Sequence, residues 1–548
     1  MSCVSEKKTD VADLVLLNGK IWTVNPAQPW AQALAVRGNR ILSVGTSDEI
    51  KKMVGDLTET IDLNGAFVLP GLIDSHTHFL DGALALSSVQ LKDVQSREAF
   101  IGRIKEKAEE LGKGGWVLDG SWDQQKFDSP EMPRKEWIDE LTRENPVFIN
   151  RYDGHMALAN SLALKMAGIT RETVSPSGGE ILKDPQTGEP TGILKDAAMD
   201  LVANKIPDIG LQEKKNAIQR ALQRAAGFGL TSIHEMAYPT QTGDYHNLEI
   251  YRQLLEENEL TARFNVYIAI KDGNRIDELK FEIPSENDKL KIGGLKGFAD
   301  GSLGSFTALF FEPYTDDPTK SGILAADMFP DGIMEERIKA ADESGLQVAI
   351  HAIGDKAIHD IVDIMERVIN EDGERDRRWR IEHAQHMASG DFERFAKLGI
   401  VASVQPYHAI DDGRWAEKKI GHERARSTYA FKSFLDNNVL LACGSDWTVA
   451  PLNPITGIYA AVTRRTLDGK NPDGWFPEQK ISLEEAIKGY TINAAFAEFA
   501  ENEKGSLESG KFADIVVLNQ NLFEIPPEDI IDTEVKITLF DGKVIYKK

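Results

Sequence analysis

Two histidines separated by one residue, His76 and His78, stand at the end of a short apolar run that begins near Leu72. Side chains on a β-strand alternate between its two faces, so positions i and i+2 point the same way. One divalent metal ion can therefore take both imidazoles as ligands. A single His-x-His pair is a weak signal, and other parts of the chain have to supply further ligands before it predicts a metal site.

Further side chains that can bind a metal close other apolar runs of the chain. His351, His383 and Asp446 each stand at the end of such a run. Imidazole nitrogen and carboxylate oxygen suit Zn²⁺ or a similar divalent ion. Lys296 is a different case, because its ammonium group repels cations. It becomes a ligand only if CO2 converts it to a carbamate, whose oxygens could bridge two ions.

These residues need a scaffold that brings strand ends together, and the rhythm of the chain predicts one. Short apolar runs alternate with helical patterns, which is typical of βα units around a parallel sheet. Eight such runs fit a closed (β/α)₈ barrel, in which catalytic side chains project from the C-terminal ends of the strands. The runs are Val68–His78, Leu230–His234, Ala262–Ile268, Gly294–Asp300, Gln347–His351, Arg378–His383, Val401–Gln405 and Leu440–Asp446.

Two parts of the chain do not fit the barrel. The segment between the first and second strands is too long for a structureless loop, which predicts an inserted subdomain. Strand and turn patterns at the two ends are each too small for a stable sheet, so we expect one small β-sandwich domain built from both termini. The expected division is a tail at 1–11, the β-domain at 12–66 and 501–548, the first barrel strand at 67–89, the inserted subdomain at 90–220 and the rest of the barrel at 221–500.

Composition and charge exclude several classes of partner. The formal net charge of −24 argues against binding to nucleic acid. No stretch is long and apolar enough to predict a transmembrane segment. The chain as it stands would be cytoplasmic, but the residues around Cys3 resemble a bacterial lipoprotein cleavage site without its hydrophobic region. If the gene begins upstream, Cys3 would be the lipid anchor of a periplasmic protein. A homodimer is compatible with such a barrel, although no residue requires one.

Six short motifs together resemble those of the amidohydrolase superfamily, specifically the amidohydrolase-3 group that includes YtcJ-like proteins and N-substituted formamide deformylases. They are Pro70–His78, Arg151–Ser161, Lys296–Ser305, His351–Asp355, Ile381–Gln385 and Gly444–Trp447. The resemblance implies a binuclear metal centre bridged by a carbamate on Lys296. Its first ion, zinc or a similar metal, would be held by His76, His78 and Asp446, and its second by His351 and His383. Phe306 departs from the pattern, which leads us to expect arginine there.

The chemistry expected of such a site is hydrolysis. A water bound to divalent ions has its pKa lowered from near 16 to roughly 7, and Asp446 can take its proton and deliver it to a leaving nitrogen. We expect hydrolysis of a small-molecule amide, N-acyl or N-formyl amine rather than a peptide bond. The alternatives are a deaminase, a hydrolase of cyclic amides or esters, and a scaffold protein that has lost catalysis. Deaminases of this superfamily usually use one metal and lack the lysine, so Lys296 argues against that alternative.

Several polar residues near the ligands are candidates for contact with the substrate. By the resemblance, the segment that carries His155 approaches the active site, where this histidine would bind substrate or stabilise the oxyanion; a structural histidine is the alternative. Asp300 and Ser302 would contact substrate or else hold their Gly-rich turn. Tyr407 and His408 follow the seventh strand and are predicted to line the pocket.

Two further polar residues stand at or beside strand ends. Glu382 precedes His383, and because strand neighbours alternate it should point away from the metals in a structural role. His234 ends the second strand, where it would contribute hydrogen bonds behind the metal ions.

Overall fold

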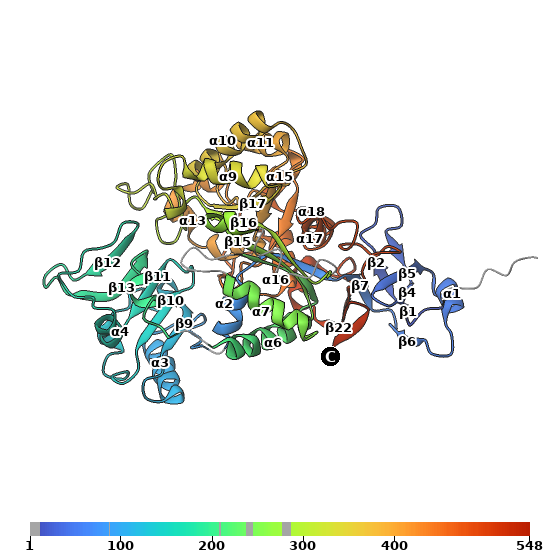
Figure 1. Cartoon of the computed structure of the whole chain (residues 1–548), viewed down its shortest axis with the longest axis horizontal. Coiled ribbons are helices and arrows are strands. Elements are labelled where there is room, and N and C mark those ends of the chain that lie inside the picture. Colours follow the sequence, from blue (N-terminus) through green and yellow to red (C-terminus); the bar gives the residue numbers. More distant parts are fainter. Residues whose placement is uncertain (1–10, 87, 208–209, 237–244, 277–286) are drawn as a thin grey trace, which may run out of the picture.

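The computed structural model describes residues 11–86, 88–207, 210–236, 245–276 and 287–548. At its centre is a sheet of eight parallel strands that follow one another in chain order (Figure 1). They are β8 (Leu72–Thr77), β14 (Leu230–Met236), β15 (Arg263–Ala269), β16 (Leu290–Phe298), β17 (Gln347–Ala352), β18 (Arg380–His383), β19 (Val401–Val404) and β20 (Leu441–Cys443). Beyond β20 the chain returns to β8, where the Asp446 amide donates to the His76 carbonyl at 2.7 Å. The sheet therefore closes into the predicted (β/α)₈ barrel.

Helices cover the outside of the barrel because each buries one apolar stripe. In α10 (Asp355–Asp372), Ile358, Ile361, Met365 and Val368 recur at helical spacing and are all buried. The other helices of the barrel region are α2 (Phe79–Ala85), α6 (Leu211–Gly227), α7 (Tyr245–Glu256), α9 (Ile333–Glu343), α11 (Asp391–Leu398), α12 (Pro406–Asp412), α13 (Ala416–Ile420), α14 (His422–Ala425), α15 (Phe431–Asp436), α16 (Pro454–Thr463), α17 (Leu483–Gly489) and α18 (Ile492–Ala497).

Both ends of the chain build a β-sandwich on one side of the barrel (Figure 1). One sheet has the order β5-β4-β1-β6 and the other β23-β22-β21-β7-β2-β3, and their facing apolar side chains form one cluster that includes Leu16, Val36 and Ile515. The strands are β1 (Leu14–Leu17), β2 (Lys20–Trp22), β3 (Trp30–Ala31), β4 (Ala33–Arg37), β5 (Arg40–Gly45), β6 (Glu59–Asp62), β7 (Phe67–Pro70), β21 (Ile515–Leu518), β22 (Val535–Phe540) and β23 (Lys543–Lys547). The predicted sandwich from two termini is therefore present.

The first predicted strand is divided between two sheets. β7 pairs with β21 in the sandwich, whereas β8 begins the barrel. Gly71 stands between them, where a Cβ atom would lie 2.2 Å from the Thr231 hydroxyl oxygen. Only glycine allows so close an approach, and it lets one continuous apolar run pass from one domain to the other.

The inserted subdomain lies on the opposite side of the barrel from the sandwich (Figure 1). Its sheet has the order β12-β13-β11-β10-β9 and its own apolar clusters. The elements are α3 (Arg97–Leu111), β9 (Val117–Trp122), β10 (Val147–Arg151), β11 (Met156–Ala159), α4 (Ser161–Met166), β12 (Gly179–Lys183), β13 (Pro190–Asp196) and α5 (Asp200–Ala203). We propose that the subdomain ends before α6 rather than at residue 220, because α6 contacts α2, β14 and β22.

Two predictions concern membranes. Among the described residues, no helix combines the length and the apolar character needed to cross a bilayer. Cys3, on which the prediction of a lipid anchor depends, lies outside the described residues.

Candidate metal centre

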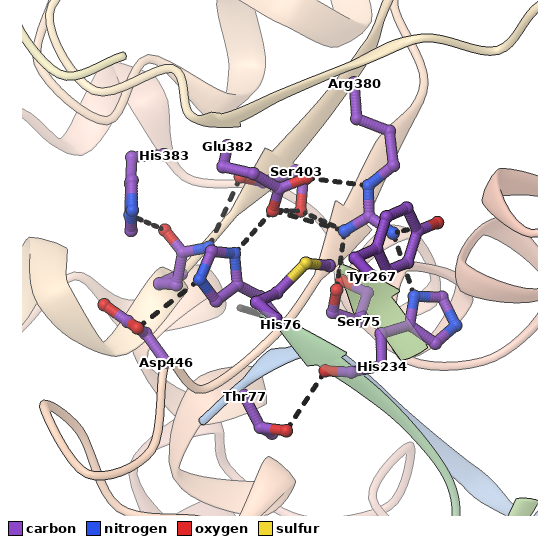
Figure 2. Close-up of polar contacts among 12 residues, drawn as sticks. Ser75, His76, Thr77, His234, Tyr267, Arg380, Glu382, His383, Ser403 and Asp446 are labelled. Carbon is purple, nitrogen blue, oxygen red and sulfur yellow. Dashed lines mark hydrogen bonds and ion pairs between the residues drawn. The ribbon is translucent and has the colours of Figure 1, made fainter. Parts of the chain in front are cut away.

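Three of the predicted ligands meet where β8 and the end of β20 lie side by side. Asp446 Oδ1 is 3.5 Å from His76 Nε2 and 3.4 Å from His78 Nε2 (Figure 2 shows His76 and Asp446). Both His76 Nε2 and Asp446 Oδ1 are buried and have no hydrogen-bond partner among the described residues. Buried polar atoms are normally satisfied, so two facing ligand atoms left without a partner fit a divalent cation between them.

The remaining two histidine ligands lie beside this group. The His351 and His383 rings are 4.5 Å apart between centroids, and His383 is 5.0 Å from His76. His383 Nδ1 is bonded to the Gln405 side-chain oxygen at 2.8 Å, and His351 Nε2 lies 3.2 Å from the Gly301 carbonyl. Each ring thus has one nitrogen engaged by the protein and one nitrogen left for a metal.

Lys296 is buried in the barrel interior. Its ammonium nitrogen has no hydrogen-bond partner among the described residues and lies 4.8 Å from the centre of the Phe298 ring. Burial lowers the pKa of this lysine to about 8. Burial of an amine without a hydrogen-bond partner costs free energy of folding. A lysine at this position is therefore more readily explained by a chemical role than by a contribution to stability.

Burial sets the protonation states that a metal requires. It lowers the pKa of His76 to about 4 and holds the pKa values of His351 and His383 well below the ordinary value for histidine. Burial alone would raise the pKa of Asp446, but the close imidazoles of His78, His76 and His383 outweigh it and hold that pKa well below its usual range. Neutral imidazoles and a carboxylate are the forms that bind cations.

His408 lies closer to the centre than its predicted role in lining the pocket requires. Its Nε2 is 3.9 Å from Asp446 Oδ2, and ligand atoms of His383, His408 and Asp446 all lie within 4.8 Å of one another. No spacing in the chain indicates this group, because His408 comes from helix α12 rather than from the end of a strand.

Glu382 points toward the ligands, and the prediction that it points away is wrong. Its Oε2 atom is 2.5 Å from His76 Nδ1 (Figure 2). The alternation of strand neighbours stops here because His383 has a φ of 70° and turns the chain at the end of β18. Burial alone would raise the pKa of Glu382, but Arg380 and His76 outweigh it and hold that pKa well below its usual range. His234 lies further inside the barrel, where its Nδ1 is 2.9 Å from an Arg380 nitrogen.

A cavity opens over the predicted ligands, and His155 and Ser302 line it together with His408. His155 comes from the turn between β10 and β11 of the inserted subdomain, and its Nδ1 is 2.9 Å from Asp196 Oδ1. Burial alone would lower the pKa of His155, but the hydrogen bond and charge of Asp196 outweigh it and raise that pKa. The structure therefore brings a cation-forming imidazole from the subdomain to the mouth of the barrel.

Asp300 does not line this cavity. Its carboxylate accepts hydrogen bonds from the backbone amides of Leu309, Ile353 and Gly354 at 2.8–3.0 Å, and burial raises its pKa to about 7. Of the two roles predicted for Asp300, the structure favours holding the loops over contact with substrate.

Tyr407 is also placed away from the ligands, contrary to the prediction. It lines a different cavity with Tyr459 and Leu467. The reason is helical phase, because successive residues of α12 point in directions about 100° apart. His408 therefore faces the metal centre while Tyr407 faces away. Phe306 packs 5.1 Å from the Tyr314 ring and is likewise outside the lining of the central cavity.

Comparisons with known proteins agree with this geometry. The sequence pattern of the amidohydrolase family matches residues 59–546. Protein LONG AFTER FAR-RED 3 of Arabidopsis thaliana is 42% identical over 98% of this chain and 92% of its own length. N-substituted formamide deformylase of Arthrobacter pascens is 26% identical over 98% of this chain and 99% of its own. The crystal structure of an uncharacterized metal-dependent hydrolase from Pyrococcus furiosus superposes with a TM-score of 0.72 and 30% identity, over 93% of this chain and 99% of that one.

Proposed function

The chain belongs to the amidohydrolase family, as its motifs predict, and is a metal-dependent hydrolase of carbon–nitrogen bonds; from that premise we propose that it hydrolyses a small amide, N-acyl or N-formyl amine at a binuclear centre. The observation that carries the proposal is the buried group of His76, His78 and Asp446, in which His76 Nε2 and Asp446 Oδ1 face each other without a hydrogen-bond partner among the residues that the structure describes. The name of the deformylase relative supports an N-formyl or related amide as substrate.

The proposed ligands divide into two sets. His76, His78 and Asp446 would hold one ion, and His351 and His383 the other. Lys296 would bridge them as a carbamate, which would account for a buried amine that has no hydrogen-bond partner in the described part of the chain. The lowered pKa of Lys296 supports this step, because only the neutral amine adds CO2. Imidazole and carboxylate donors suit zinc.

The protein's own residues would move the protons of the reaction. When bound, the ions lower the pKa of water and act as Lewis acids toward the substrate carbonyl. The Asp446 carboxylate would accept a proton from the attacking water and pass it to the leaving nitrogen. The His155 imidazolium, oriented by Asp196, would donate a hydrogen bond to the oxyanion of the tetrahedral intermediate. One water and one amide thus give one amine and one carboxylic acid.

The lining of the cavity narrows the class of substrate. Asp153, Asp411 and Asp412 line it, whereas neither lysine nor arginine is among its described lining residues. A substrate carboxylate would therefore be desolvated there without a cationic side chain of that kind to pair with. This favours amides of neutral or cationic amines over N-acyl amino acids.

A matched pair of substrates tests this proposal. N-formyl-2-phenylethylamine and N-formylphenylalanine differ only by one carboxylate. We expect zinc-loaded protein to hydrolyse the first with a kcat/KM at least about tenfold higher, which corresponds to about 1.4 kcal/mol, and a chelator to abolish the activity. If a broad panel of N-formyl, N-acetyl and N-acyl compounds gives no hydrolysis, the proposed reaction is wrong. A preference for the amino acid would overturn only the substrate class.

A further inference from the structure

The barrel interior below the metal centre is charged, although the centres of such barrels are usually filled by branched apolar side chains. Arg380 on β18 is fully buried there. Its guanidinium bonds Glu382 at 2.8 Å, Ser403 Oγ at 2.8 Å and the Ser75 carbonyl at 2.5 Å, as well as His234 (Figure 2). Because hydrogen bonds hold the Arg380 guanidinium from several sides, it has a single orientation. It therefore also fixes the orientation of a carboxylate that pairs with it.

Glu382 is the carboxylate that Arg380 fixes. Its Oε1 accepts from Arg380, and its Oε2 accepts from Ser403 Oγ at 2.6 Å and faces His76 Nδ1 at 2.5 Å. An ionised carboxylate can only accept hydrogen bonds. The ring proton of His76 must therefore sit on Nδ1, which leaves the Nε2 lone pair directed toward Asp446.

The partner of His76 differs in charge from the partners of the other ligand histidines. His78 Nδ1 is bonded to the Met236 carbonyl at 2.9 Å, and His383 Nδ1 to the neutral amide oxygen of Gln405. His351 Nε2 likewise faces a backbone carbonyl. Asp300 Oδ1 lies farther from that nitrogen, at 3.6 Å. Among these contacts of the described residues, the carboxylate of Glu382 is the one within hydrogen-bond distance of a ring nitrogen that faces the protein, at 2.5 Å from His76 Nδ1. A carboxylate fixes the ring and raises its basicity as a ligand more than a neutral oxygen does.

We propose that Glu382, locked by Arg380, is a positioning residue for His76: it sets the tautomer and direction of this ring and strengthens it as a metal ligand. The inference depends on the proposed function, because it assumes that His76 binds an ion. If the inference holds, the buried charges of Arg380 and Glu382 contribute to metal affinity as well as to the stability of the barrel.

Glu382→Gln tests the inference, with zinc affinity measured by competition against a chromophoric chelator. The substitution keeps the shape of the side chain and removes its charge. We expect zinc at the weaker-binding step of titration to bind about 10- to 100-fold less tightly, as is usual when an outer partner of a metal ligand is lost. Thermal unfolding of the metal-free protein and its circular dichroism report separately on the fold.

Asp514→Asn is the matched control. Asp514 pairs with Arg263 at 2.8 Å, and their side chains are 5% and 4% exposed, so the same chemical change removes the same kind of buried ion pair. The Arg263–Asp514 pair joins β15 to the sandwich domain, and neither residue lines the cavity over the metal centre. We expect this variant to lose stability and to keep wild-type zinc affinity.

A second variant, Glu382→Asp, tests the inference if Glu382→Gln does not fold. Glu382→Asp keeps the negative charge for Arg380 but withdraws the carboxylate from His76 by one methylene group. We expect a folded protein with weakened zinc binding. Wild-type zinc affinity in folded Glu382→Gln or Glu382→Asp protein would overturn the inference. Failure of the wild-type protein itself to bind zinc or any other divalent ion would instead overturn the proposed function.

Discussion

Replacement of Asp446 by asparagine separates chemistry from folding at the centre of the site. Asp446 has a φ of 58°, a left-handed conformation that asparagine adopts more readily than most residues. The substitution should therefore leave the backbone unstrained. It replaces a buried carboxylate that faces the His76 and His78 imidazoles at 3.4–3.5 Å by a neutral amide of the same shape, so we expect the metal-free protein to stay folded.

The expected loss of activity is large. A positioned general base contributes roughly 10²- to 10⁴-fold to the rate, which corresponds to about 3–5 kcal/mol in the activation free energy. Loss of the carboxylate as a metal ligand would add to this. The assay is kcat on the best amide at saturating zinc, together with the metal content of the same sample by mass spectrometry.

The two roles of Asp446 give different results in that assay. If metal is retained while kcat falls, the carboxylate acts in proton transfer; if metal is lost as well, it acts as a ligand too. Asp446→Ala is a useful contrast, because alanine disfavours the left-handed region and should lower the melting temperature. Near-normal kcat in the asparagine variant would refute the reasoning about Asp446.

Three further predictions follow from the site. Lys296→Met replaces a buried amine, which has no hydrogen-bond partner among the described residues, by an apolar side chain of similar length. We expect unchanged or higher stability, one metal ion per chain where the wild type is expected to hold two, and loss of any activation by bicarbonate. Two ions in this variant would exclude a bridging role. Because the folded-state pKa of His155 is raised, the stability that its pair with Asp196 contributes is present below the ordinary histidine pKa and is lost as pH rises through the folded pKa. The gap in unfolding free energy between wild type and Asp196→Asn should therefore shrink as pH rises, and a gap that widens would contradict the assignment. His408→Gln removes the buried nitrogen 3.9 Å from Asp446; we expect at least a severalfold loss of kcat/KM with circular dichroism unchanged, and unaltered kinetics would mean that His408 only fills space.

The barrel, and the meeting of candidate ligands at the ends of its strands, could be predicted because each rests on a local pattern. Apolar runs identify the strands, and His351 and His383 each stand at the end of such a run. The division between β7 and β8 could not be predicted, since the apolar run continues across Gly71 and only the close approach of Thr231 shows the break. Pairings far apart in sequence, such as Arg263 with Asp514, leave no local signal at all.

The errors near the site have one common cause. Strand alternation gave the wrong direction for Glu382 because the rule holds only while the backbone stays extended, and His383 with its φ of 70° ends that regularity. The prediction for Tyr407 failed at a similar transition, where β19 gives way to α12 and the period changes from two to 3.6. Catalytic side chains in this fold lie at the ends of strands, so the rules for interior strand residues are least reliable where function is located.

The cavity combines parts that the protein holds in place separately. Barrel strands and the buried Arg380 and Glu382 fix the ligands from below. The turn between β10 and β11, which carries His155 and forms one wall of the cavity, is fixed within the inserted subdomain. There the Arg151 guanidinium bonds Asp153 at 2.6 Å and Asp123 at 3.3 Å. The Arg380 and Arg151 contacts just named have no side chain in common, and the subdomain meets the barrel loop through the hydrogen bond from Ser302 Oγ to Asp153 at 3.4 Å. Changes of sequence elsewhere in the subdomain would therefore leave the candidate metal ligands in place. Such a separation would let one hydrolytic centre serve different substrates, with part of the choice of substrate residing in the insertion.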